Sequence, residues 1–322
     1  MIRVALLVVN GFTDSGLSVL LDVLRTANVL SPGAFHIDVA SASGPSVRAA
    51  SGLALSGVRS LRVAASADVV IVPGIWIERA EALDNVLARA DVHAVCRAVW
   101  RAERRGALVA GACAGVFLLA ESGVLANRRV TTTWWLAPEL ARRHPRVRVE
   151  TGEALLVHGR VLTAGAVFAV ADLALSLVGR FLGPTQAHRC SSLLLLDRHP
   201  SQAPYMALHQ LTSQDPLVRR AEQWVRAHLG KPFAMAALAK AVGTSTRTLA
   251  RKLERAVGLA PVAFVQRIRV ETAVHLLRTT RKTTAEISEA VGYTDESTLR
   301  RLLRRDAHAS ARELRSRAAR AS

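Results

Sequence analysis

The stretch LVAGACAGVFLLA, residues 108–120, sets a cysteine between a short apolar strand and a helix-like run. The apolar residues up to Gly111 are typical of a buried strand, and the run that starts at Ala114 is closed by Gly123. A nucleophile held on a sharp strand-to-helix turn has this pattern. The stretch therefore predicts an α/β fold with Cys113 at the end of a strand, and it raises the question of whether this cysteine is catalytic.

Strands and helices alternate along the first 182 residues. Most of the expected strands are continuous apolar runs, which are typical of a parallel sheet that is covered on both faces. The expected strands cover residues 4–9, 35–41, 67–74 and 107–111, and the expected helices cover 17–30, about 80–105, 114–123 and 166–180. Residues 153–165 are expected to form a hairpin that turns at His158 and Gly159. The alternation predicts a parallel sheet between two layers of helices.

Positive charge is concentrated in the last third of the chain. The 322 residues carry a formal net charge of +18, and residues 215–322 hold 22 Lys and Arg against 10 Asp and Glu. A basic domain of this size most often binds a polyanion, either nucleic acid or an acidic membrane surface. An arginine-rich solvated surface is the alternative that charge alone leaves open.

The cysteines and the apolar segments limit the classes of protein to which this chain could belong. The three cysteines, Cys96, Cys113 and Cys190, are far apart and form no CxxC pair, which argues against a disulfide framework or a zinc site. The sequence predicts no cofactor and no metal. The amino-terminal apolar run is too short for a signal peptide, and polar residues interrupt the apolar segment 161–178. We therefore expect a cytoplasmic protein without a membrane partner.

The tail contains an internal repeat. The segments LAKAVGTSTRTLARKL (238–253) and ISEAVGYTDESTLRRLL (287–303) both contain Ala-Val-Gly, at an offset of 49 residues. In each segment a glycine, Gly243 or Gly292, allows the left-handed turn of a helix-turn-helix, and Ser245 or Thr294 is a candidate cap for the second helix. The repeat predicts two helix-turn-helix units, at about 234–257 and 284–305, each with a second helix suited to the DNA major groove.

Residues 217–315 resemble an AraC-type DNA-binding domain, on the strength of the two repeats and the connecting segment FVQRIRVETAVHLLRTT (264–280). The resemblance implies that both second helices enter successive major grooves of duplex DNA. It implies eight base-facing residues: Thr246, Arg247, Ala250 and Arg251 in the first unit, and Glu296, Ser297, Arg300 and Arg301 in the second. Arginine is suited to guanine, and Glu296 to cytosine or to capping its helix. Contact with phosphate alone is the other interpretation of the arginines.

Both units depart from the family pattern. Leu253 and Leu303 stand where the family usually has phenylalanine. The usual closing Gly, Pro and Tyr are replaced by His308, Ala311 and Leu314. Leucine is a tolerable core substitute, but the lost Gly and Pro leave open whether the second unit engages DNA.

The first 180 residues resemble the ThiJ/PfpI-like branch of the class I glutamine-amidotransferase folds. The likeness is carried by VVIVPG, GACAGVFLLAESGVL, VTTTWW and LTAGAVFAVADLALSLV. Such a domain fused to an AraC-type tail is the arrangement of GlxA-like transcriptional regulators of the AraC family. The resemblance implies a flavodoxin-like α/β sandwich with a parallel sheet, followed by an all-α domain with two helix-turn-helix units.

The catalytic partners of such a cysteine are missing. Catalytic relatives place a histidine directly after the cysteine or on a nearby strand, where this chain has Ala114 and Thr133. They also place an acid on the first helix, where this chain has Gly16. A helix N-terminus is expected to favour the Cys113 thiolate. The sequence leaves open whether His93, His144 or His158 approaches Cys113.

A small-molecule pocket at the strand ends is therefore the main expectation, since ligands of open α/β sheets bind beyond the carboxyl ends of the strands. Amides near Ala114, Gly74 and Ile75 could bind an oxygen of the ligand. The candidate pocket residues are Cys113, Ala114, Gly74, Ile75, Trp76, Thr133, Trp134 and Asp14.

The sequence predicts a sequence-specific DNA-binding transcriptional regulator in three parts. Residues 1–182 are expected to bind a small-molecule effector, to form a homodimer, or both; residues 183–216 to be a linker; and residues 217–322 to bind DNA. Two alternatives remain: a cysteine-dependent hydrolase or amidase with an accessory nucleic-acid domain, and an N-terminal domain that only dimerises. The effector, the operator and the sign of regulation stay open.

Overall fold

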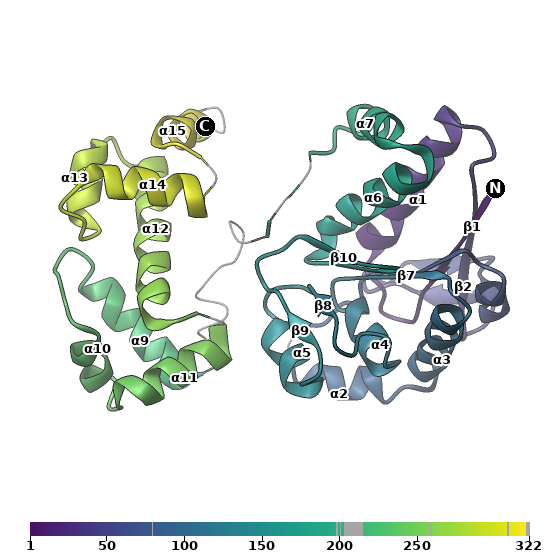
Figure 1. Cartoon of the computed structure of the whole chain (residues 1–322), viewed down its shortest axis with the longest axis horizontal. Helices are drawn as coiled ribbons and strands as arrows, with labels where there is room; N and C mark the ends of the chain where they lie inside the picture. Colours follow the sequence, from purple (N-terminus) through teal and green to yellow (C-terminus); the bar gives the residue numbers. More distant parts are fainter. Residues whose placement is uncertain are drawn as a thin grey trace. The chain divides into compact units, whose positions relative to one another are not determined.

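A computed structural model describes residues 1–78, 80–197, 199, 201–202, 215–257, 259–307 and 309–319. The chain divides into two compact units, Met1–Gln202 and Ala203–Ser322 (Figure 1). The first unit runs beyond the predicted boundary at residue 182, because helix α7 (Pro184–Leu193) packs on the helices before it. The start of the predicted linker 183–216 is therefore folded, and its residues 203–214 lie outside the described residues.

The first unit is built on a seven-stranded sheet in the order β10-β11-β7-β6-β1-β2-β5. All neighbouring strands of this sheet are parallel except the edge pair β10 and β11. The strands are β1 (Ile2–Leu7), β2 (Phe35–Ser41), β5 (Arg59–Ser60), β6 (Val69–Val72), β7 (Leu108–Ala112), β10 (Leu155–His158) and β11 (Val161–Ala164). The flavodoxin-like sandwich and the hairpin at residues 153–165 are confirmed.

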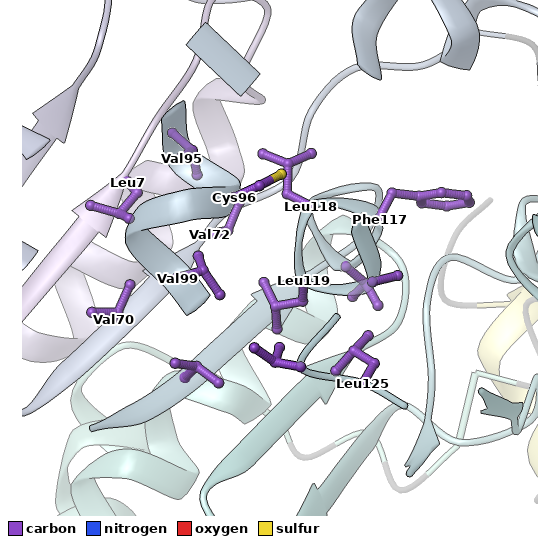
Figure 2. Close-up of a cluster of buried hydrophobic side chains, with 14 of the residues drawn as sticks. Leu7, Val70, Val72, Val95, Cys96, Val99, Phe117, Leu118, Leu119 and Leu125 are labelled. Atoms are coloured by element: carbon purple, nitrogen blue, oxygen red, sulfur yellow. The ribbon is translucent and has the colours of Figure 1, made fainter. Parts of the chain in front are cut away.

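Alternate strand residues face the two helical layers. Val70 and Val72 belong to the apolar core on one face, and Val69 and Ile71 belong to the core on the other. One layer consists of α2 (Ala82–Leu87), α3 (Ala90–Arg104), α4 (Gly115–Glu121) and α5 (Ala137–Arg143), and the other of α1 (Asp14–Leu30), α6 (Val170–Leu182) and α7. Figure 2 shows Val95 and Val99 of α3 in the same core as Val70 and Val72.

Short elements complete the first unit. The paired strands are β3 (Ser46–Arg48) with β4 (Ala54–Ser56), and β8 (Arg129–Val130) with β9 (Arg148–Val149). Two 3-10 turns, η1 and η2, cover Leu61–Ala65 and Val167–Ala169. The predicted helical region 80–105 is two helices, α2 and α3.

The described part of the second unit is helical. Its helices are α9 (Pro216–Ala227), α10 (Met235–Ala241), α11 (Thr246–Val257), α12 (Pro261–Thr279), α13 (Thr284–Ala290), α14 (Glu296–Asp306) and α15 (Ala311–Ala319). Helix α12 connects the two helix-turn-helix pairs and contacts both (Figure 1). The apolar core of this unit includes the buried residues Leu238, Leu249, Phe264, Ile268, Leu277, Ile287 and Leu299. Trp224 and Leu276 are only partly buried.

Across the described ranges, no helix combines the length and the apolar character that a membrane crossing requires.

Candidate functional site: the cavity at Cys113

The strand order reverses direction beside β1, because β2 lies on one side of β1 and β6 on the other. The loops that follow β1 and β6 meet at this point. The Thr13 amide and hydroxyl both donate to the Gly74 carbonyl, at 2.8 and 3.1 Å, and the Trp76 amide donates to the Gly11 carbonyl at 2.9 Å. Open α/β sheets bind their ligands at such a switch point.

A cavity of about 530 Å³ opens at these strand ends, a size that suits a small organic molecule. Of the predicted pocket residues, Asp14, Ile75, Trp76, Cys113, Ala114 and Thr133 line it. Its other lining residues are Thr13, Ser15, Ala50, Ser51, Leu53, Ile77, Trp135, Leu136 and Val167. Six of the eight predicted pocket residues therefore line one cavity, and the sequence analysis did not identify most of its other lining residues.

Two predicted pocket residues have other roles. Gly74 lets its loop approach the elbow, since a Cβ at this position would lie 3.2 Å from the Cys113 Cβ. Trp134 is buried and packs edge-to-face on Trp135, with ring centroids 5.1 Å apart, so that Trp135 lines the cavity in its place. Two adjacent tryptophans gave no sequence signal for which ring would face inward.

The wall that the sequence missed comes from the segment that follows β3. Ala50, Ser51 and Leu53 lie more than 50 residues before Cys113 in the sequence and carry no motif. The Ser51 hydroxyl donates to the Asp14 carboxylate at 2.5 Å and fixes this segment to the start of α1. These residues reach the cavity only because the segment after β3 folds back against the start of α1.

Cys113 occupies a strained turn between β7 and α4. Its φ is +53°, a left-handed value that is uncommon for any residue except glycine. Its amide donates to the Ala164 and Gly165 carbonyls at 3.1 and 2.9 Å, and its carbonyl accepts from the Thr132 hydroxyl at 2.8 Å. The predicted elbow is present, and its backbone is held by two other segments of the chain.

Burial changes the expected chemistry of the thiol. Burial raises the pKa of Cys113 to about 11, although the neighbouring Ala114 amide and Thr133 hydroxyl act in the opposite direction. The expectation of a thiolate stabilised at the helix start was therefore wrong, because desolvation exceeds the effect of a helix of seven residues. At neutral pH the side chain is a neutral thiol.

No histidine lines the cavity with Cys113 in the part of the chain that the structure describes. The three histidines that the sequence left open lie elsewhere. His144 Nε2 lies 3.3 Å from Glu121 Oε1, and His93 and His158 are exposed and do not line the cavity. A side chain at Gly16 would meet the Thr13 hydroxyl at 2.6 Å, so an acid cannot be seated there without moving Thr13. Within the same residues, no group of His, Cys, Asp and Glu could hold a metal ion.

Candidate functional site: the helix-turn-helix units

The first helix-turn-helix unit has the expected turn and cap. Gly243 adopts a φ of +74°, and the Ser245 hydroxyl accepts from the Thr248 amide at 3.2 Å. Of the predicted DNA-contacting residues on α11, Thr246, Arg247 and Arg251 are exposed and Ala250 is partly buried. Neither arginine has an ion-pair partner among the residues described here, so both guanidinium groups are available to a ligand.

The second unit repeats the turn with a different cap. Gly292 adopts a φ of +82°, but Asp295 and not Thr294 caps α14, since its carboxylate accepts from the Ser297 amide at 2.9 Å. Because Asp295 takes this place, Glu296 is free to pair with Arg300, at 2.7 Å.

The predicted DNA-contacting residues of α14 therefore differ in availability. Ser297, Arg300 and Arg301 are exposed and Glu296 is partly buried. Arg301 has no ion-pair partner within the described ranges, whereas Arg300 would have to leave Glu296 to reach a base.

The departures from the family pattern leave both units packed. Leu253 and Leu303 are fully buried, and Leu314 of α15 is also buried against the same core as Leu303. Ala311 is partly buried at the start of α15. His308 lies outside the described residues.

Comparison with known proteins agrees with this division of the chain. Residues 2–180 match the model of the DJ-1/PfpI family, and residues 238–317 match the model of a helix-turn-helix domain. The first match covers more than half of the chain.

The relatives combine the same two parts. The chain is 26% identical to the HTH-type transcriptional regulator CdhR of Pseudomonas aeruginosa over 294 residues, which cover 90% of this chain and 84% of that regulator. It is 25% identical to the HTH-type transcriptional regulator GlxA of Rhizobium meliloti over 300 residues, which cover 90% and 88% of the two chains. A crystal structure of an AraC family transcriptional regulator from Pseudomonas putida shares the fold, with a TM-score of 0.54 at 22% identity over 60% of this chain and 100% of that one.

Proposed function

The chain belongs to the DJ-1/PfpI family and carries an AraC-type helix-turn-helix domain, and we propose that it regulates transcription by coupling a small-molecule cavity to sequence-specific DNA binding. The organisation is that of GlxA-like HTH-type transcriptional regulators. The observation that carries the proposal is the pair of helix-turn-helix units, each with an exposed arginine, Arg247 or Arg301, on its second helix. A protein of this kind acts in the cytoplasm, where bacterial DNA lies.

DNA binding is tested with the full chain. We expect specific binding to duplex fragments selected from genomic DNA, with an affinity that falls steeply as salt rises. With about six phosphate contacts, the slope of log affinity against log salt is about −5. Binding that ignores both salt and sequence would contradict the DNA-binding function.

The cavity at Cys113 is proposed as the effector site. The Thr133 hydroxyl supports this, because it is fully buried at the cavity wall and, among the described residues, interacts with the Cys113 thiol but bonds to no oxygen or nitrogen. A thiol is a weak hydrogen-bond partner, so a ligand that offers a stronger one would stabilise this buried hydroxyl.

The cavity lining also restricts the chemistry of the effector. Asp14 is the one charged residue in the described lining, and no described cation pairs with it. The remaining wall is mostly apolar and includes Trp76 and Trp135. We therefore propose a small, largely apolar effector without net negative charge. A thermal-shift screen with neutral, cationic and anionic molecules of equal size tests this, and stabilisation by the anions alone would contradict it.

Cys113 is proposed as part of the cavity wall and not as a nucleophile. Cys113→Ser should leave DNA binding by the ligand-free chain unchanged, whereas Cys113→Trp should fill the cavity and abolish the response to an effector. The competing hydrolase function is tested by assaying amide, ester and aldehyde substrates beside Cys113→Ser. Turnover by the wild type that this variant lacks would make the protein an enzyme.

The homodimer expected from the sequence stays a prediction. Sedimentation of the full chain with and without DNA tests it, and a monomer under both conditions would contradict it.

A further inference from the structure

Gln202 is the last residue of the first unit, and its side chain is almost completely buried, with 4% exposed. Its amide donates to the Gly152 carbonyl at 2.9 Å. Its side-chain Nε2 lies 2.9 Å from each of the Thr132 and Thr151 carbonyls, and its Oε1 accepts from the Ala166 amide at 3.1 Å. A polar residue at the end of a domain is usually exposed, so the burial of Gln202 needs an explanation.

Gly165 leaves the space for this side chain. A Cβ at Gly165 would lie 2.5 Å from Gln202 Oε1, closer than such atoms can approach. Gly165 does not adopt the left-handed conformation, so backbone geometry does not require a glycine there. Within the described residues, the Gln202 side chain is what meets that added Cβ.

The same two segments hold the elbow of the cavity. Thr132 binds Gln202 through its carbonyl and Cys113 through its hydroxyl. Gly165 borders Gln202 and accepts from the Cys113 amide. The next residues along, Thr133 and Val167, line the cavity. A ligand that shifts Thr133 or Val167 therefore also affects the hydrogen bonds that hold the Gln202 side chain.

We propose that Gln202 is the residue that couples occupancy of the Cys113 cavity to the segment leading to the DNA-binding unit, an inference that rests on the proposed effector site. Gln202 seated between the 131–133 and 165–166 segments holds the end of the first unit in place. A change in the cavity residues near Cys113 alters the hydrogen bonds of Gln202. Loss of those hydrogen bonds in turn alters the cavity residues, because coupling between two sites is reciprocal.

Within the described residues, Gln202 is the last anchored residue before the second unit. The residue before it is also held, because the Ser201 hydroxyl donates to the Gly152 carbonyl at 2.6 Å and Ser201 forms a backbone bridge with Glu153. Release of Gln202 would therefore move the last anchored residue back by one position, roughly 3.5 Å of extended chain.

The test uses the full chain and hydrogen–deuterium exchange, which needs no effector. In Gln202→Ala, the segment around Cys113 should exchange about tenfold faster, because the hydrogen bonds behind it are lost. In Thr132→Val, which removes the hydroxyl bond to Cys113, the segment that ends at Gln202 should exchange faster by a similar factor. Gly165→Ala should reproduce Gln202→Ala by displacing the side chain.

Controls separate coupling from general destabilisation. Gly179→Ala on α6 adds a Cβ in ordinary contact at 3.6 Å from the Ala187 Cβ and should change neither segment. Exchange of β1 should stay unchanged in every variant. In the double variant Gly165→Ala with Gln202→Ala, the added Cβ has room, so its effect should not exceed that of Gln202→Ala alone.

The outcomes distinguish this inference from the function on which it rests. Faster exchange in both directions with β1 unchanged supports the coupling. Exchange that changes only beside the substituted residue, or equally throughout the first unit, overturns it. If the wild type binds DNA as proposed but substitution in either segment leaves exchange of the other unchanged, the proposed regulatory function is retained and the coupling role of Gln202 is contradicted. If the wild type does not bind DNA, the proposed function fails whatever the exchange shows.

Discussion

The two helix-turn-helix units share a sequence repeat but differ in how their turns are packed. The first turn is open, since a Cβ at Gly243 would have no neighbour within 4 Å. The second turn is enclosed, since a Cβ at Gly292 would collide with the Leu229 carbonyl oxygen and lie 2.9 Å from the Arg269 guanidinium. The second turn is therefore packed closely against other segments of the domain, and the first is not.

The starts of the two second helices differ in charge. The first begins with a neutral Ser245 cap, and its Arg247 has no ion-pair partner among the described residues. The second begins with Asp295 and Glu296, and Glu296 holds Arg300. Acidic groups at a DNA-facing helix start repel phosphates, so we expect the first unit to contribute more of the electrostatic affinity and the second more of the domain's stability.

The largest expected effect separates the two turns. Both glycines have positive φ, so alanine at either costs about 1–2 kcal/mol of folding free energy from the left-handed backbone. Gly292→Ala carries an additional overpacking cost of about 1–3 kcal/mol against Leu229. Denaturant unfolding of the full chain measures both variants. Equal losses would show that the second turn can relax and that the difference in packing has no energetic consequence.

The next effect separates the two arginines. Arg247→Ala and Arg301→Ala should each cost about 1–3 kcal/mol of binding at the selected site and relax the base preference there. Binding titrations on the selected site and on single-base variants measure this. A uniform loss on all sequences would identify phosphate contacts. A loss for Arg247→Ala with none for Arg301→Ala would mean that the second unit does not engage DNA.

The caps predict a pH dependence confined to the second unit. Hydrogen bonds from Ser297 hold the pKa of Asp295 below its ordinary value. The stabilisation from this carboxylate is therefore present above the unfolded pKa of about 3.9 and is lost as pH falls through the lower folded pKa. Asp295→Ser, which copies the Ser245 cap, should lower the melting temperature at neutral pH by an amount that shrinks on acidification. A difference that is constant with pH would contradict the assigned cap.

The smallest expected effect concerns the Glu296–Arg300 pair. Glu296→Gln removes an exposed i,i+4 pair and should cost no more than about 0.5 kcal/mol of stability. It should nevertheless strengthen DNA binding, because it frees Arg300 and removes a negative charge. Weaker binding at the selected site would instead support the interpretation that Glu296 accepts from cytosine.

Local sequence determined the architecture of both units. Continuous apolar runs such as residues 69–72 can be satisfied only by a sheet covered on both faces, and this is the sheet that forms. The repeated Ala-Val-Gly located both turns, because glycine tolerates the left-handed conformation that each turn adopts. The position of Cys113 at a strand end followed from the same local pattern, and with it the place of the cavity.

Long-range packing decided what local sequence could not. Burial, and not the helix start, set the pKa of Cys113, since desolvation depends on every segment that covers the thiol. Asp295 became the cap because its carboxylate, and not the Thr294 hydroxyl, reaches the Ser297 amide. The seat of Gln202 joins residues from four separate segments, and no pattern in the sequence brings them together. The sequence by itself determined the main strands and helices and the place of the elbow at Cys113, because those depend on neighbours along the chain. The tertiary structure alone decided the protonation state of Cys113, the cap of the second unit and the burial of Gln202, because those depend on neighbours in space.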